Sequence, residues 1–293
     1  MTTTITAEQK EQLKVLQQEE INGHFAYAKL AEVVKDENNA AVIRRISGEE
    51  RKHYNVWKSY TGEEVKPNHF KINLYFWIAK ILGLTFGIRL MEQGEEKVQV
   101  IYSKLLDSIP EAAQILADEE KHEDELMEML DEESLRYAGS MVLGLNDALV
   151  ELTGALAGLT FAFKDSRTIA LAGLVTGISA AFSMAASDYL SNKADDDGKN
   201  PTRSAIYTGI AYLITVMILI APYLLASNYV ISLVWTLVNA ILVIALFNYY
   251  ISVARGYNFK QRFFEMAGIS MGVALFSFLI SNVISAWLGV SGA

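Results

Sequence analysis

The chain has no cysteine and only four histidines among its 293 residues. Without a thiol it forms no disulfide, holds no cysteine-ligated zinc or iron–sulfur centre and performs no thiol catalysis. The first residues also lack an apolar core followed by a cleavage site, so we expect no signal peptide.

Acidic charge is concentrated in the first part of the chain, whose total net charge is −9. Residues 1–136 hold 26 acidic and 17 basic side chains, whereas residues 137–293 hold eight of each. The acidic part repels nucleic-acid phosphates and attracts cations, so we expect no nucleic-acid partner. Long apolar runs fill the rest. We therefore expect two domains in two solvents, 1–135 in water and 136–293 in a lipid bilayer.

Apolar residues recur at helical spacing in the first part and predict an antiparallel four-helix bundle. Thr6 with Gln9 and Ser108 with Glu111 fit capping boxes, which mark the starts of the first and fourth helices. We expect Asn38 to open the second helix. The expected helices span about 7–35, about 38–60, a segment that ends near 107, and about 109–132.

Two of the four histidines follow a glutamate by three residues, at Glu50/His53 and Glu119/His122. Residues i and i+3 project from one helix face, so each pair can bind one metal ion and bridge to a second. A single pair of this kind is often an ordinary surface contact, but here it is repeated on two expected helices. Carboxylate oxygen combined with imidazole nitrogen suits iron or manganese.

The other two expected helices each carry a glutamate followed by a tyrosine seven residues later, at Glu20/Tyr27 and Glu95/Tyr102. One glutamate from each of two helices, with Glu-x-x-His from the other two, is the ligand set of carboxylate-bridged two-metal bundles. The tyrosines are either core residues or contacts of the ligands.

Over about 8–132 these motifs resemble the rubrerythrin-like branch of the ferritin-like superfamily. The resemblance implies two iron or manganese ions per chain and a set of metal ligands: Glu20, Glu50, His53, Glu95, Glu119 and His122, with Glu92 as an extra or switching ligand. Rubrerythrins usually carry a cysteine-ligated iron module that feeds electrons to the metal pair. The absence of cysteine argues against a self-contained peroxidase.

Residues 72–91 form an apolar stretch of nearly spanning length with Lys80 near its centre. As a membrane span, this stretch would separate Glu20 and Glu50 from Glu95 and Glu119. We therefore expect an extension of the third helix that lies on the bilayer surface or against a partner subunit.

The second part holds five apolar runs long enough to cross a bilayer of roughly 30 Å. They span about 138–163, 168–190, 204–226, 229–252 and 266–289. Basic residues favour one set of connecting loops, namely Lys193, Lys199, Arg203, Arg255, Lys260 and Arg262. The positive-inside rule then predicts a cytoplasmic N-terminal domain and a C-terminus outside the cell, in a multi-pass inner-membrane protein.

Charged side chains are rare inside these runs. Asp147 and Glu151 lie four residues apart in the first run and therefore share a helix face. Buried carboxylates in lipid are costly unless they are protonated, paired or facing water, so the pair indicates a cation path or a hydrogen-bonded pair. Met184 and Asp188 near the end of the second run offer a soft sulfur and a carboxylate at its cytoplasmic mouth.

The segments GLNDALVELTGALAGL (144–159) and ISAAFSMAASDYLS (178–191) are similar to spans 1 and 2 of the vacuolar iron transporter family. That resemblance implies a homodimer with five spans per subunit that moves Fe²⁺ or Mn²⁺ out of the cytoplasm in exchange for protons. The path it implies comprises Asp147, Glu151, Met184 and Asp188. The chain lacks the long Glu-rich segment that plant and fungal members carry between spans 2 and 3.

We therefore expect an all-α protein in which a ferritin-like bundle precedes five transmembrane helices, as in membrane-bound ferritins. The expected function is Fe²⁺ export, with the bundle capturing, sensing or oxidising iron. Two alternatives stay open at this point. One is a membrane-anchored ferroxidase or peroxide-scavenging enzyme, and the other is a Mn²⁺ transporter with the same ligand chemistry.

Overall fold

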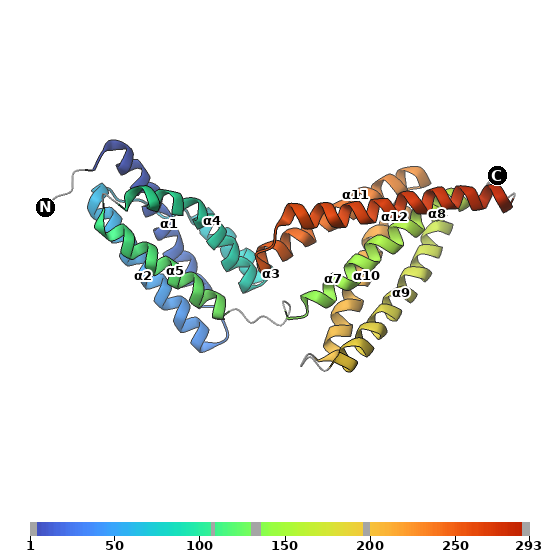
Figure 1. Ribbon diagram of the computed structural model, residues 1–293, viewed down its shortest axis with the longest axis horizontal. Helices are drawn as coiled ribbons and strands as arrows, with labels where there is room; N and C mark the ends of the chain where they lie inside the picture. The colour runs from blue at the N-terminus through green and yellow to red at the C-terminus, as the bar shows by residue number, and fades with distance from the viewer. Residues whose placement is uncertain (1–4, 107–108, 130–135, 196–199, 289–293) are drawn as a thin grey trace. The chain divides into compact units, whose positions relative to one another are not determined.

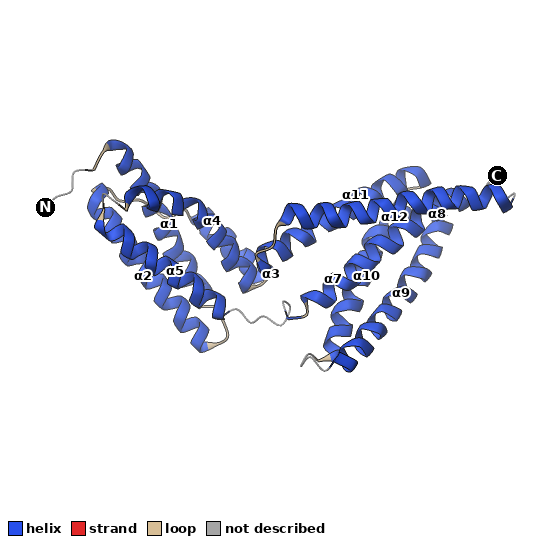
Figure 2. Ribbon diagram, viewed as in Figure 1, coloured by secondary structure: helices blue, strands red, loops and turns tan. Residues whose placement is uncertain are grey.

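The computed structural model of the chain describes residues 5–106, 109–129, 136–195 and 200–288. Every regular element in these ranges is helical, as Figure 2 shows. The chain divides into two compact units, Met1–Glu132 and Glu133–Ala293.

The first unit contains five helices (Figure 1): α1 Ala7–Ala31, α2 Glu37–Thr61, α3 His69–Leu82, α4 Leu84–Leu105 and α5 Pro110–Met129. The capping box of Thr6 and Gln9 is present at the start of α1, as predicted. Helix α2 begins earlier than expected, because Asp36 rather than Asn38 caps it by accepting a 2.9 Å hydrogen bond from the Asn39 amide. The expected capping residue Ser108 lies outside the described residues.

The apolar stretch 72–91 is not one continuous helix, which corrects the expectation of an extended third helix. Helix α3 ends at Leu82, and α4 begins at Leu84 after Gly83, whose φ of 103° is accessible mainly to glycine. With 14 residues, α3 is about 21 Å long and too short to cross roughly 30 Å of hydrocarbon.

Two apolar cores lie at different levels along the helices of the first unit. One includes Leu30, Ile46, Ile88 and Leu126, and the other includes Leu13, Trp57, Leu105 and Ile115. Along α1, α2 and α5 the glutamates and histidines of the two-metal motif fall between the positions that build these two cores. The fold thus encloses a polar layer between two apolar ones.

The second unit consists of helices that are long and apolar enough to cross a membrane. The five candidate spans are Ala138–Phe163, Ser166–Ala194, Pro201–Leu225, Tyr229–Arg255 and Phe259–Ser281. The first comprises α7 Ala138–Asp147, the π-helical turn η1 Ala148–Leu152 and α8 Thr153–Phe163; the others belong to α9 Ser166–Asp195, α10 Pro201–Leu225, α11 Tyr229–Arg255 and α12 Phe259–Leu288. The prediction of an all-α protein with five spans is confirmed.

Small residues let these helices approach one another closely. Gly177 on α9 faces Val216 on α10, and a Cβ atom built at Gly177 would lie 2.8 Å from a Val216 methyl group. Tyr212, Leu219 and Tyr223 of α10 are buried in the same core. Packing of this kind stabilises membrane helices, because lipid offers no hydrophobic driving force between them.

Candidate metal centre

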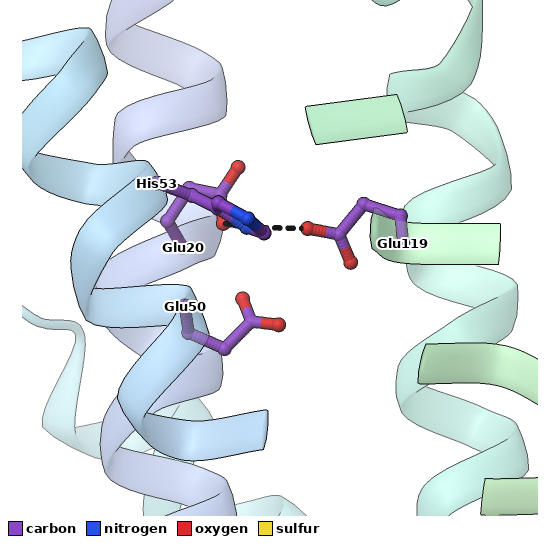
Figure 3. A group of neighbouring side chains, drawn as sticks. All are labelled: Glu20, Glu50, His53 and Glu119. Atoms are coloured by element: carbon purple, nitrogen blue, oxygen red, sulfur yellow. Dashed lines mark hydrogen bonds and ion pairs between the residues drawn. The ribbon is translucent and has the colours of Figure 1, made fainter. Parts of the chain in front are cut away.

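Four predicted ligands come together in the polar layer of the first unit. Glu20 from α1, Glu50 and His53 from α2 and Glu119 from α5 offer ligand atoms that all lie within 4.8 Å of one another. Figure 3 shows Glu119 pointing across to His53, while the carboxylates of Glu20 and Glu50 point into the same space. The helical spacing of three residues within Glu-x-x-His places Glu50 and His53 on one face of α2, as this convergence requires.

The second histidine of the motif completes a nearly symmetric arrangement. His122 Nδ1 lies 3.3 Å from Glu50 Oε1 and 3.5 Å from Glu119 Oε2. His53 Nδ1 lies 2.9 Å from Glu119 Oε1 and 3.4 Å from Glu20 Oε2. The two imidazole rings stack with centroids 5.8 Å apart. Both Nδ1 atoms therefore face the carboxylates at the centre of the cluster.

The opposite ring nitrogens face carboxylates that sequence reasoning did not select. His122 Nε2 lies 2.8 Å from Glu49 Oε2, and His53 Nε2 lies 3.4 Å from Asp118 Oδ2. Glu49 directly precedes Glu50 on α2 and faces the histidine of α5. Asp118 directly precedes Glu119 on α5 and faces the histidine of α2. Such partners hold an imidazole in the orientation and tautomer that a metal ligand needs. The repeated acid–glutamate pair in EERKH and DEEKH was the signal for them.

Aromatic side chains fix the outer edge of the cluster. Tyr102 donates a 2.6 Å hydrogen bond to Glu20 Oε1, and Trp57 Nε1 donates a 3.0 Å bond to the same oxygen. Tyr27 donates a 2.6 Å bond to Glu92 Oε1. Each tyrosine thus joins α1 to α4. No local sequence pattern identified Trp57, which lies one turn after His53.

The buried charges of this layer depend strongly on one another. Burial by itself lowers the pKa of His53, but the interactions of its imidazole with the carboxylates of Glu119 and Glu20 outweigh burial and raise this pKa to about 10. The pKa of His122 is raised in the same way, mainly by Glu119. Burial favours the neutral form of Glu119, yet its bonds with the two imidazoles hold its pKa below the ordinary value. Without a metal ion, the histidines therefore act as the counter-cations.

Glu92 differs from the other acids. Burial raises its pKa to about 7, the Tyr27 hydrogen bond opposes this shift, and repulsion from Glu119 adds to it. It therefore changes protonation near neutral pH in the metal-free protein. The side chain of Glu95, the remaining predicted ligand, lies outside the described residues.

The donor set fits a divalent metal ion. Glu20, Glu50, His53 and His122 are buried, and buried charges are costly unless they are paired or bind a metal. Within the described residues, Glu20 Oε2 and His122 Nδ1 are buried without a hydrogen-bond partner although both face the cluster. Oxygen and imidazole ligands suit iron or manganese.

In the second unit, two predicted path residues lie at the π-helical turn of the first span. Asp147 precedes η1 and Glu151 lies within it, and their carboxylates interact electrostatically. Tyr212 of α10 donates a 3.2 Å hydrogen bond to Glu151 Oε2. Such turns often occur at functional sites, because the extra residue redirects the side chains around it. Sequence reasoning identified neither Tyr212 nor η1.

Asp147 lines a pocket of about 590 Å³ formed by α7, η1, α11 and α12. The polar side chains beside it are Asn146, Asn248, Arg262 and Glu265, none of which was predicted. Glu151 instead lies exposed on the surface of the unit.

Met184 and Asp188, the other two predicted path residues, are not among the described residues that line this pocket. Met184 is half-buried and packs against the apolar core. Asp188 is buried, and its Oδ2 has no hydrogen-bond partner within the described residues. The structure thus places Asp147 and Glu151 one helical turn apart in the first span, whereas Asp188 is buried on α9.

Comparison with known proteins gives one match, which lies in the second unit. Residues 138–199, which include the first span and all the described residues of α9, match the VIT family. No curated protein and no solved structure matches the chain. Together, the match and the five apolar helices indicate a multi-pass membrane protein and support transport of a metal ion, iron or manganese, as its coarse function.

Proposed function

We propose that the chain is an Fe²⁺ exporter whose N-terminal unit is a ferritin-like bundle that captures iron for transport. The observation that carries the proposal is the convergence of Glu20, Glu50, His53 and Glu119 within 4.8 Å, in a chain whose membrane part matches the VIT family. The sequence resemblance to rubrerythrins supports the same arrangement.

In the first unit, two iron ions would be held by Glu20, Glu50, His53, Glu119 and His122, with Glu95 as the sixth ligand. When bound, the metal pair supplies a redox-active centre that accepts oxygen ligands. The chain's own residues orient this ligand set, because Glu49 and Asp118 face the outer nitrogens of the histidines. Glu92 and Tyr27 form a hydrogen-bonded pair beside it that can exchange a proton near neutral pH.

In the second unit, Fe²⁺ would pass as the substrate along a path that includes Asp188, Met184, Asp147 and Glu151. A carboxylate inside a bilayer is costly unless it is protonated, paired or in water, which supports a cation path at Asp147 and Glu151. Carboxylates that bind a metal must release protons, so exchange of metal for protons follows from the same chemistry.

Orientation and assembly complete the proposal. The basic loops support an inner-membrane protein with a cytoplasmic first unit and a C-terminus outside the cell. Glu151 lies exposed near the middle of the first span, where contact with lipid would be unfavourable. A homodimer that covers this face would remove the carboxylate from the lipid.

The competing function is that of a membrane-anchored ferroxidase or peroxide-scavenging enzyme. A simple anchor needs no carboxylate pair within a span, so Asp147 and Glu151 favour transport. Mn²⁺ uses the same ligands as Fe²⁺ and is the alternative substrate.

The test is metal flux into proteoliposomes that contain the purified full chain. The lumen is acidic and Fe²⁺ is added outside. We expect uptake by those molecules whose first unit faces the outer medium, and we expect this uptake to stop when a protonophore dissipates the proton gradient. Mn²⁺ in the same assay measures selectivity. Absence of flux for both ions, together with consumption of O₂ or peroxide by the iron-loaded protein, would replace the transporter proposal with the enzyme.

A further inference from the structure

Helix α3 carries a row of large apolar side chains on its outer face. Phe70, Leu74, Trp77 and Ile81 recur at i, i+4, i+7 and i+11, so they lie on one side of the helix. They are 78%, 46%, 53% and 72% exposed, respectively. We call these four residues the α3 stripe. Isolated exposed apolar residues are common, but a contiguous row of this size marks an interaction surface.

The opposite face of α3 already makes the contacts that hold the helix on the bundle. Ile72 and Ala79 are buried there, and Tyr75 and Phe76 pack against the core formed with α1, α2, α4 and α5. A helix that packs on a protein and faces water normally has a polar outer side. Packing of the first unit therefore accounts for the inner face of α3 and leaves the stripe unexplained.

The charge around the stripe differs from that of the rest of its unit. Residues 65–91 hold four basic side chains and no acidic one, although residues 1–136 carry a net charge of −9. Lys80 beside the stripe is exposed, and its Nζ lies 4.9 Å from the centre of the Trp77 ring. Tryptophan and lysine together are typical of helices that lie at a membrane interface. Anionic headgroups complement this charge.

The short connection between the units keeps the end of α5 close to a bilayer. Helix α5 ends at Met129, and the first candidate span begins at Ala138. The eight intervening residues extend over at most about 30 Å. The end of the first unit therefore stays within that distance of a lipid surface.

We propose that the α3 stripe inserts into the interfacial region of the bilayer and docks the first unit on a membrane surface that contains anionic lipid. The stripe lies parallel to the surface, with Lys80 among the headgroups and the two-metal layer above it. A second copy of the chain is the competing occupant. Four side chains on one short helix offer less surface than the about 800 Å² per partner that a stable protein interface buries, which favours lipid.

The absence of cysteine allows a direct measurement on the full chain. Leu74→Cys and Ile81→Cys each carry a nitroxide label on the stripe, and Ser59→Cys on α2 is the matched exposed control. The metal-free labelled proteins are placed in nanodiscs of phosphatidylcholine with phosphatidylglycerol. Electron paramagnetic resonance then compares collisions with oxygen, which enters lipid, and with a charged, water-soluble paramagnetic chelate.

We expect the oxygen-to-chelate collision ratio at Leu74 and Ile81 to be roughly tenfold that at Ser59, because the interface excludes the charged chelate. Adding Lys80→Glu should lower the ratio in phosphatidylglycerol and leave it nearly unchanged in phosphatidylcholine alone. Circular dichroism confirms that each variant keeps its helices. Equal ratios at all three positions overturn the proposal. Protection from both reagents, with dipolar broadening between labels, also overturns it and assigns the stripe to a second copy.

Discussion

The two units gather carboxylates in different solvents and compensate them differently. In the first unit, Glu20, Glu50 and Glu119 surround two histidines, and Tyr102 and Trp57 donate hydrogen bonds to one oxygen of Glu20. In the second, Asp147 immediately before the π-helical turn and Glu151 within it interact electrostatically, and Tyr212 donates a hydrogen bond to Glu151. The first cluster is enclosed by four helices, whereas Asp147 opens to a pocket and Glu151 to the surface.

We interpret this difference as the one between capture of the ion and its passage through the membrane. A site in which every ligand is held by a second contact binds a cation tightly and releases it slowly. A site with few contacts binds weakly, which transport requires because the ion must leave as readily as it enters. The two proposed roles, capture and transport, thus differ in how many hydrogen bonds and ion pairs hold the carboxylates that would bind the ion.

The largest expected effect is that of Asp147→Asn on flux. Removing the charge while keeping the shape should lower Fe²⁺ uptake into proteoliposomes roughly a hundredfold, since the side chain no longer attracts the ion into the membrane. Metal bound by the first unit should be unchanged.

The matched control is Asp165→Asn, in the connection between α8 and α9. Asp165 accepts hydrogen bonds from Thr168 at the start of α9, and asparagine caps a helix equally well. This variant should transport normally. Undiminished flux in Asp147→Asn would remove that residue from the path. The second unit would then have no identified weak metal ligand to compare with the cluster of the first unit.

Glu119→Ala should act on binding rather than on flux at saturating iron. Glu119 lies beside both histidines, so its loss should reduce the metal content of the purified chain from about two ions to fewer than one. Inductively coupled plasma mass spectrometry measures this number after desalting. The adjacent, exposed Glu120→Ala is the control and should keep both ions. Unchanged metal content in Glu119→Ala would contradict the two-metal assignment.

A smaller effect is expected from pH on the metal-free first unit. The pKa of His53 is raised from its ordinary value of 6.5 to about 10. A raised histidine pKa stabilises the fold fully below about pH 6.5, and this contribution is lost as pH rises through 10. We expect the free energy of unfolding to fall by a few kcal/mol over that range.

Hydrogen–deuterium exchange of peptides from α2 and α5, in excess chelator at pH 6.5, 8 and 9.5, measures this loss once intrinsic exchange rates are corrected. His53→Gln should flatten the dependence. Added Fe²⁺ under anaerobic conditions should reverse the trend, because metal binding displaces protons and strengthens as pH rises. Constant protection of the metal-free protein over this range would show that the imidazole–carboxylate pairs do not stabilise the layer.

The sequence predicted the helices and much of the first cluster, because both depend on spacing within single helices. The repeated Glu-x-x-His pair needed only the three-residue period to identify Glu50 and His53. Contacts between helices depend on packing register, which a single sequence does not show. For that reason Glu49, Asp118 and Trp57 were missed. The break at Gly83 was marked by a glycine, but continuous apolar composition on both sides favoured one long helix.

The π-helical turn had no local signal, because its residues, ALVEL, are ordinary helix formers. Asp147 and Glu151 were selected by their charge, their spacing and the family resemblance of their segment, whereas their different exposures depend on how α10, α11 and α12 pack around the first span. Metal binding by the cluster of the first unit and by the carboxylates of the first span stays a prediction, which Glu119→Ala and Asp147→Asn test.

The smallest expected effects come from the two tyrosines that donate to carboxylates, and they compare the units directly. Tyr102→Phe leaves Glu20 with its bond from Trp57, so metal affinity, measured by titration with Fe²⁺, should fall less than tenfold. Tyr212→Phe removes the donor to Glu151, and flux should change only a few-fold, because this oxygen is exposed and gains little from one bond at 3.2 Å. If Tyr212→Phe instead abolished flux while Tyr102→Phe left binding intact, the membrane site would be the more rigidly supported of the two. The difference between capture and passage would then require a different explanation from the number of contacts around each carboxylate.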